Sequence, residues 1–127
     1  PLVAFLNKRE TNHQWAANAF QTFKAPLRTC ESVISEACFL LRNKMGGSDA
    51  LMEMLDRKAV KVDFNLNQEY ERVRQLMKRY ADTPMSLADA CLVRMSELMT
   101  DCEIVTLDND FEFYRRNGRQ KIPLRIP

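Results

Sequence analysis

The stretch SLADACLVRMSELMTDCEIVTLD, residues 86–108, predicts a helix followed by a buried strand. At about 100° per residue, the apolar side chains of the helical part form one arc, which we expect to face a core. The arc consists of Leu87, Ala88, Cys91, Leu92, Met95, Leu98 and Met99. The segment CEIVTL is short, apolar and partly β-branched, as is typical of a strand covered on both faces. Residues 86–108 therefore favour an α/β fold.

Acidic residues stand near the start of this helix and just after the strand. Asp89 lies near the helix start, and Asp108 and Asp110 follow the strand. In open α/β sheets ligands bind beyond the carboxyl ends of strands, so Asp108 and Asp110 are expected at a functional position. Asp89 has two interpretations. Ser86-x-x-Asp89 matches a capping box, which is a structural role, and Asp89 is also a candidate functional acid.

The composition indicates one soluble, folded domain covering residues 1–127. The length of 127 residues is near the rough guide of about 150 residues per domain. Hydrophobic residues make up 46% of the chain and charged residues 28%, with few glycines and prolines, which excludes a disordered chain. The net charge of +2 identifies no partner, so any contact with nucleic acid must come from local basic patches.

The cysteines and the histidine limit the chemistry. The four cysteines show no C-x-x-C spacing, and no segment resembles a secretory signal or a membrane span. We expect reduced thiols in a cytoplasmic protein that does not enter a membrane. His13 is the only histidine, and we expect it to be an exposed residue in the first turn of a helix. A catalytic pair of histidines is therefore impossible and a zinc site lacks ligands, so any chemistry must use carboxylates.

Helix and strand patterns alternate along the rest of the chain. Apolar spacing predicts helices over 13–23, 33–43, 49–57 and 65–81. Short apolar or alternating segments predict strands over 27–32, 60–64 and 122–127. We expect Ser32 to cap the helix over 33–43. This order implies a mainly parallel sheet covered by helices on both faces.

Glu36 is the unusual residue of the helix over 33–43. Every other residue from Val33 to Leu41 except Ser35 is apolar or small, and Glu36 falls between Phe39 and Leu40 on the helical wheel. Burying a glutamate there is costly unless a cation or a hydrogen-bond network meets it. A first-turn acid stabilised by the helix dipole is the structural alternative.

Three acids occupy comparable positions in the predicted fold. Glu36 and Asp89 lie near the starts of core helices, and Asp108 lies at the end of a core strand. In a parallel α/β sheet such positions share one edge. A carboxylate cluster without histidine or cysteine suits a hard divalent cation such as Mg²⁺ or Mn²⁺. The predicted chemistry is metal-assisted hydrolysis of a phosphodiester.

Four segments resemble the PIN-domain ribonucleases, and especially the VapC-type toxins of bacterial toxin–antitoxin pairs. They are PLVAFLNKRE, TCESVISEA, YADTPMSLADACLVRMSE and CEIVTLDNDFEFYR, which together span nearly the whole chain. The resemblance implies a three-layer α/β/α domain with a central, mainly parallel sheet. It also implies that Glu36, Asp89 and Asp108 bind Mg²⁺ or Mn²⁺ for RNA cleavage. Asp110 is then a further metal ligand, with Ser35 and Thr106 as supporting polar neighbours.

The sequence departs from the family's pattern at one point. The first acid of the family lies at the end of an opening strand, just before a segment like PLVAFL, whereas this sequence starts at Pro1. Either that strand and its acid lie upstream of Pro1, which we expect, or the protein lacks this ligand. The resemblance also implies a homodimer and an antitoxin segment that covers the site.

Basic residues follow the acidic turn. Arg115, Arg116, Arg119 and Lys121 are near enough in sequence to contact an RNA backbone beside the metal, or they form an ordinary solvated surface. A non-catalytic PIN-like module that binds RNA or protein is the main alternative to the ribonuclease. A flap-type DNA nuclease is less favoured, because the chain lacks room for additional DNA-binding elements.

Overall fold

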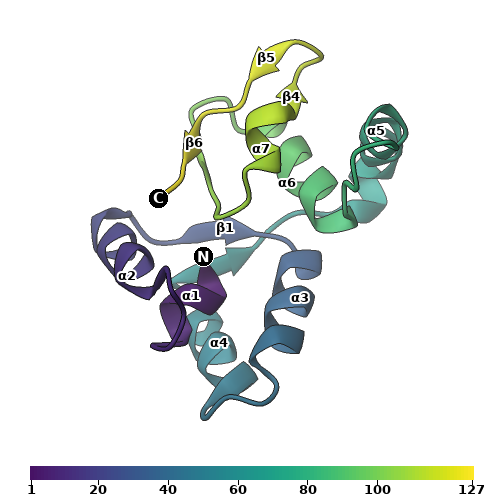
Figure 1. The fold of residues 1–127 in the computed structure, drawn as a ribbon. Helices are drawn as coiled ribbons and strands as arrows, with labels where there is room; N and C mark the ends of the chain where they lie inside the picture. The colour runs from purple at the N-terminus through teal and green to yellow at the C-terminus, as the bar shows by residue number, and fades with distance from the viewer. The chain divides into compact units, whose positions relative to one another are not determined.

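Seven helices and six short strands make up the computed structural model, which describes all residues from 1 to 127 (Figure 1). About 52% of the residues are helical and 11% are in strands, so the predicted mixed α/β class is confirmed. The strands form three separate two-stranded sheets, and the three-layer arrangement stays a prediction. None of the helices combines the length and apolar character needed to cross a bilayer.

The chain divides into two compact units. Unit 1 comprises residues 1–63 with Pro127, and unit 2 comprises residues 64–126. Unit 1 contains α1 (Leu2–Leu6), α2 (His13–Thr22), β1 (Leu27–Thr29), α3 (Glu31–Leu41), α4 (Gly47–Asp56) and β2 (Val60–Val62). Unit 2 contains α5 (Leu66–Arg79), α6 (Leu87–Leu98), β3 (Ile104–Val105), α7 (Asp110–Phe113), β4 (Arg115–Arg116), β5 (Gln120–Lys121) and β6 (Leu124–Arg125).

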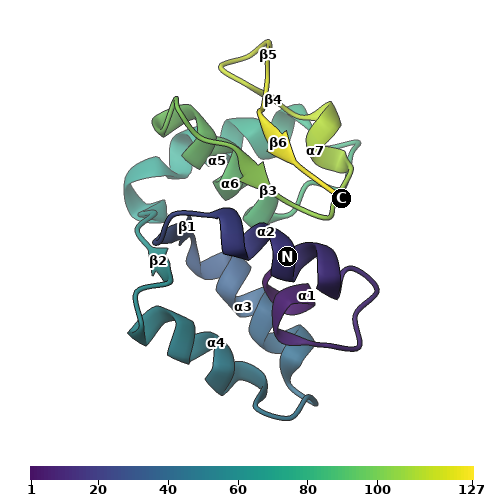
Figure 2. The ribbon, with the colours of Figure 1, turned by 90° about the vertical axis from the view of Figure 1, so that its left-hand side faces the viewer.

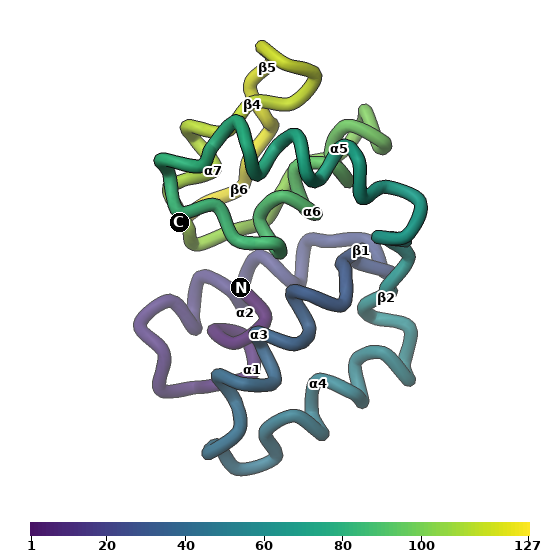
Figure 3. Tube along the Cα trace, turned by 90° about the vertical axis from the view of Figure 1, so that its right-hand side faces the viewer, coloured from purple at the N-terminus to yellow at the C-terminus, as the bar shows by residue number.

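Unit 1 packs its helices around a small apolar core. Ala37, Leu41 and Leu51 are its buried centre, and side chains of α1 pack against them. The turn between α3 and α4, visible in Figure 3, depends on glycine. Gly46 has a φ of 76°, and a Cβ added to Gly47 would lie 2.9 Å from the carbonyl oxygen of Leu41. Strand β1 pairs in parallel with β2, as the sequence predicts.

Three expectations for unit 1 are wrong. Helix α3 begins at Glu31 after Cys30, which provides no side-chain cap, so Ser32 lies inside the helix instead of capping it. Glu36 therefore lies in the second turn, where the helix dipole has little effect. His13 is only partly exposed, because its Nδ1 lies 2.8 Å from the carbonyl oxygen of Ala4 and forms a hydrogen bond with it.

Unit 2 joins the predicted helices to two pairs of strands. Strand β6 pairs in parallel with β3, as Figure 2 shows, and this confirms the predicted last strand. Strands β4 and β5 form an antiparallel hairpin that the sequence patterns did not reveal. Its turn contains Asn117 and Gly118, both with positive φ, which is typical of tight hairpins.

The predicted apolar arc of α6 is only partly correct. Ala88, Cys91 and Met95 are buried, but Leu87 and Leu98 are 40% and 49% exposed. The buried residues of α6 also include Ala90, Val93 and Ser96. Helix α6 packs against both α5 and β4, so it buries a wider surface than a one-sided arc.

The buried carboxylate of Glu97 connects α5, α6 and the hairpin. Its side chain is 2% exposed and accepts hydrogen bonds from Arg72, at 2.9 and 2.7 Å, and from Arg94 at 3.3 Å. The backbone N–H of Asn117 donates a further bond of 2.7 Å. Burial alone would raise the pKa of Glu97, but the bonds from Arg72, Asn117 and Arg94 outweigh burial and lower it.

Glu97→Gln is expected to lower the free energy of unfolding by about 2 kcal/mol, because Arg72 loses its anionic partner in a buried place and Arg94 keeps only its ion pair with Glu69. The matched control is Glu53→Gln, which removes an exposed ion pair with Arg57. It should change stability by less than about 0.5 kcal/mol. Urea denaturation measures both values, and equal effects of the two changes would contradict this role of Glu97.

The contribution of Glu97 should also depend on pH. Its folded-state pKa is lowered, so the stabilisation is fully present above the ordinary glutamate value of 4.5 and is lost as the pH falls below it. We expect the stability difference between wild type and Glu97→Gln to be constant near neutrality and to shrink on acidification. Urea denaturation over an acidic pH series measures this, and a difference that grows as the pH falls would be the contrary result.

Candidate functional site

Asp89 is fixed at the start of α6 by three hydrogen bonds. The N–H of Asp89 donates to Ser86 Oγ at 3.0 Å, and the N–H of Ser86 donates to Asp89 Oδ2 at 3.2 Å. This is the capping box that the sequence predicts, and it is confirmed. The hydroxyl of Tyr114 donates to the same Oδ2 at 3.1 Å. Both bonds to the carboxylate fall on Oδ2, which leaves Oδ1 for another partner.

Tyr114 is buried in an aromatic cluster that holds its hydroxyl against Asp89. Its ring lies 5.0 Å from that of Tyr80 and 5.3 Å from that of Phe111, both in edge-on contact. The hydroxyl of Tyr80 accepts a hydrogen bond of 2.9 Å from the N–H of Arg115. The sequence analysis missed Tyr114, since nothing local to NDFEFY indicates a partner 25 residues away.

The acids after β3 are positioned by local hydrogen bonds. Buried Thr106 accepts a bond of 3.0 Å at Oγ1 from the N–H of Asp108. Asp108 Oδ1 in turn accepts a bond of 2.9 Å from the N–H of Asp110, the first residue of α7. Asp108 is exposed and Asp110 is partly exposed, so both carboxylates remain open to a ligand.

These acids act on one another electrostatically. Burial raises the pKa of Asp89, and the negative charge of Asp108 raises it further, while the bonds from Ser86 and Tyr114 offset only part of the effect. Burial also raises the pKa of Tyr114, with contributions from Asp89, Asp110 and Asp108. Asp89, Asp108 and Asp110 therefore form one group of like charges, which we call the acidic cluster.

The acidic cluster suits a hard cation in the kind of donor it offers. Its ligands are carboxylate oxygens, and the repulsion between Asp89 and Asp108 is the type of interaction that a bound cation relieves. No group of three or more His, Cys, Asp or Glu side chains is arranged to hold a metal ion. Mg²⁺ is commonly held by one or two carboxylates, completed by water and substrate phosphate. Asp89 and Asp108 offer that number and kind of donor.

Glu36 belongs to unit 1, whereas the acidic cluster belongs to unit 2. Glu36 and Ser35 are both exposed on α3, beside Phe39 and Leu40, which are 61% and 57% exposed. The expectation that Glu36 is set into a buried apolar surface is therefore wrong, and it needs no cation to offset burial. A shared site of Glu36, Asp89 and Asp108 stays a prediction.

The predicted RNA-binding arginines have three different environments. Arg116 is buried, and its guanidinium donates to the carbonyl oxygens of Ser96 and Thr100 at 3.0 and 3.4 Å. It has a structural role and is not available for RNA. Arg115 is partly exposed and donates to the last carbonyls of α7. Arg119 is exposed in the turn of the hairpin.

Comparison of the sequence with protein-family models found no matching family, and comparison with curated proteins found no match.

The capping box makes a prediction about the stability of Asp89 variants. Asp89→Ala loses the bonds from Ser86 and Tyr114 and should lower the free energy of unfolding by about 1 to 2 kcal/mol. Asp89→Asn keeps an oxygen that accepts both bonds, so it should lie within about 1 kcal/mol of wild type. Thermal and urea denaturation measure both variants. Equal destabilisation by Ala and Asn would contradict the hydrogen-bonding role.

Proposed function

We propose that this protein is a metal-dependent endoribonuclease of the VapC-like toxin type, which hydrolyses RNA phosphodiester bonds. The acidic cluster is the observation that carries the proposal: Asp89 in the first turn of α6 interacts electrostatically with Asp108, which follows β3, and no cationic side chain is bonded to either. A carboxylate whose pKa is raised by burial and by a neighbouring acid, and which keeps an oxygen atom free, is a candidate for a functional site. The resemblance of the four sequence segments to PIN-domain ribonucleases supports the same chemistry.

Each residue of the cluster has a role in this proposal. Asp89 and Asp108 hold Mg²⁺ or Mn²⁺, with Asp110 and Glu36 as further ligands. When bound, the metal supplies an activated water and stabilises charge that develops on the phosphate. Tyr114 directs Asp89 through its bond to Oδ2, and Thr106 fixes the backbone of Asp108. Ser35 is the polar neighbour of Glu36.

Arg119 is the arginine best suited to bind RNA. It is exposed, whereas Arg116 is buried and Arg115 is engaged with backbone carbonyls. Lys121 is exposed on the adjoining strand β5 and adds a second positive charge. These charges bind the phosphate backbone, and an accessible single strand or loop is the preferred RNA.

The partners of the proposed enzyme follow from the resemblance. A VapC-like ribonuclease acts in the cytoplasm as a homodimer, and a cognate antitoxin covers its site. These three properties are part of the proposal and rest on the resemblance alone.

A non-catalytic RNA- or protein-binding module is the second candidate. The completed capping box favours it, because the bonds of Asp89 to Ser86 give the acid a sufficient structural reason to be present. The two candidates differ in what Asp89→Asn does: the enzyme loses its activity, whereas the module keeps its fold and its binding.

Metal-dependent RNA cleavage is the decisive measurement. We expect the full-length protein, free of any antitoxin, to cleave RNA in Mg²⁺ or Mn²⁺ and not in chelator. Asp89→Asn should reduce cleavage at least about 100-fold, because it removes the charge of a metal ligand and keeps the cap. Asp101→Asn is the control, since Asp101 is exposed in the loop before β3. No cleavage of varied RNAs by well-folded protein would favour the binding module.

Arg119→Ala should weaken RNA binding about equally for all sequences, because a phosphate contact carries no sequence information. The salt dependence of the affinity should also fall by about 0.7 in slope, the value for one phosphate contact on a single strand. Fluorescence anisotropy with single-stranded RNA at several salt concentrations measures both. Arg57→Ala, directly after the end of α4, is the control, and an unchanged slope with Arg119→Ala would exclude this contact.

A further inference from the structure

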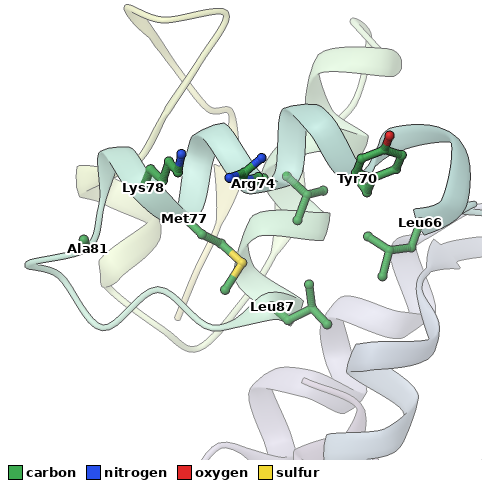
Figure 4. Close-up of a pocket in the computed structure, with 8 residues that line it drawn as sticks. Leu66, Tyr70, Arg74, Met77, Lys78, Ala81 and Leu87 are labelled. Atoms are coloured by element: carbon green, nitrogen blue, oxygen red, sulfur yellow. The ribbon is translucent and has the colours of Figure 1, made fainter.

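An apolar groove lies along the exposed side of α5 and the start of α6 (Figure 4). It has a volume of about 490 Å³ and is lined by the apolar residues Leu66, Tyr70, Val73, Met77, Ala81 and Leu87. Leu66, Tyr70 and Met77 are 37%, 55% and 37% exposed. Three large apolar side chains in a row on one helix face are more than the scattered exposure of an ordinary surface, and they indicate a binding site.

The groove also has a positive rim. Arg74 and Lys78 line it from α5, one helical turn apart, and both are exposed (Figure 4). No salt bridge in the structure involves either residue, whereas Arg72 of the same helix is bonded to Glu97. The charge of the rim is therefore available to an outside partner, and it is complementary to acidic side chains.

The backbone of the groove restricts the form of its occupant. The groove walls come from two helices, whose backbone N–H and C=O groups are bonded within each helix, so the groove has no strand edge to extend. A strand cannot pair with these walls, whereas a helix brings its own backbone hydrogen bonds and presents apolar side chains along one face. The span from Leu66 to Lys78 is about 18 Å, at 1.5 Å per residue, or just over three turns of such a helix.

We propose that this α5–α6 groove binds an acidic amphipathic helix of a partner protein. Its apolar side chains fill the groove, and its carboxylates face Arg74 and Lys78. RNA is a poorer occupant, because Tyr70 is the one aromatic side chain of the lining on which a base could stack, and the other uncharged lining residues are aliphatic. A second copy is also disfavoured. Two α5 helices related by a two-fold axis would bring Arg74 and Lys78 of one copy near Arg74 and Lys78 of the other, and these positive charges repel. This inference is independent of the ribonuclease proposal.

Designed helical peptides test the proposal directly. The probe is a stapled helix with leucine at positions i, i+4, i+7 and i+11 and glutamate beside them; its matched partner has lysine in place of glutamate, and a third peptide has the same residues in scrambled order. We expect the acidic helix to bind about tenfold more tightly than the basic helix, with no measurable binding of the scrambled peptide. Fluorescence anisotropy with labelled peptides gives the affinities.

Variants of the positive rim and of the apolar lining locate the binding. Arg74→Glu with Lys78→Glu should reverse the preference, so that the basic helix binds more tightly, whereas Lys44→Glu in unit 1 should leave it unchanged. Met77→Asp should weaken binding of the acidic helix about tenfold, whereas Met52→Asp on α4 should have no effect. Met52 is a matched control because its exposed fraction, 42%, is similar to the 37% of Met77. Tyr70→Ala is the second groove variant, for use if Met77→Asp does not fold by circular dichroism.

Three results would overturn the proposal. The first is failure of the acidic helix to bind at millimolar concentration, or equal binding of the scrambled peptide. The second is a dimer, seen by sedimentation, that Met77→Asp dissociates, because the groove is then occupied by a second copy. The third is displacement of the bound acidic helix by single-stranded RNA in wild type and loss of RNA binding in Met77→Asp, because the groove then belongs to RNA.

Discussion

The hydrogen bonds to one carboxylate oxygen of Asp89 organise the candidate site of unit 2. Oδ2 accepts from the N–H of Ser86 and from the hydroxyl of Tyr114, so the start of α6 is joined to the end of α7. Helix α7 follows directly from Asp108 and Thr106 at the end of β3. A single acid thus joins the start of α6 to the residue after α7, and the second oxygen of the acid remains available for a ligand.

Unit 2 contains two carboxylates, those of Glu97 and Asp89, whose pKa values are shifted in opposite directions. Glu97 is surrounded by Arg72, Arg94 and a backbone N–H, and its pKa is lowered despite burial. Asp89 has neutral donors and another acid nearby, and its pKa is raised, first by burial. The charge of Glu97 is compensated within the fold, whereas that of Asp89 is not. An uncompensated charge costs stability, which is the physical reason why we propose a functional role for Asp89 and a structural one for Glu97.

The features that the sequence predicted correctly are encoded locally. The capping box at Ser86 and Asp89 needs residues three apart, and the end of β3 is marked by the change from apolar to acidic residues. The wrong predictions concern whether a side chain is buried against the core or exposed to solvent. Periodicity placed Glu36 in an apolar arc, but could not tell that Phe39 and Leu40 stay exposed.

Contacts between residues distant in sequence could not be predicted either. The bond from Tyr114 to Asp89 and the burial of Arg116 against the carbonyl of Ser96 depend on how α6 packs against the hairpin and α7. No pattern within a short window carries that information. Tyr114, which was missed, and Arg116, which was predicted to bind RNA, therefore lie close together in sequence, at the end of α7 and in β4.

Helix α6 contributes residues to two surfaces of different chemistry. Leu87 lines the apolar groove, and Asp89, two residues later, belongs to the acidic cluster. Two residues correspond to a rotation of about 200° around a helix, so these side chains project to nearly opposite sides. The first turn of α6 therefore separates an apolar surface with a positive rim from a cluster of negative charge. A cation and an acidic helix would each find one of these surfaces and be repelled by the other, so that the two ligands need not compete.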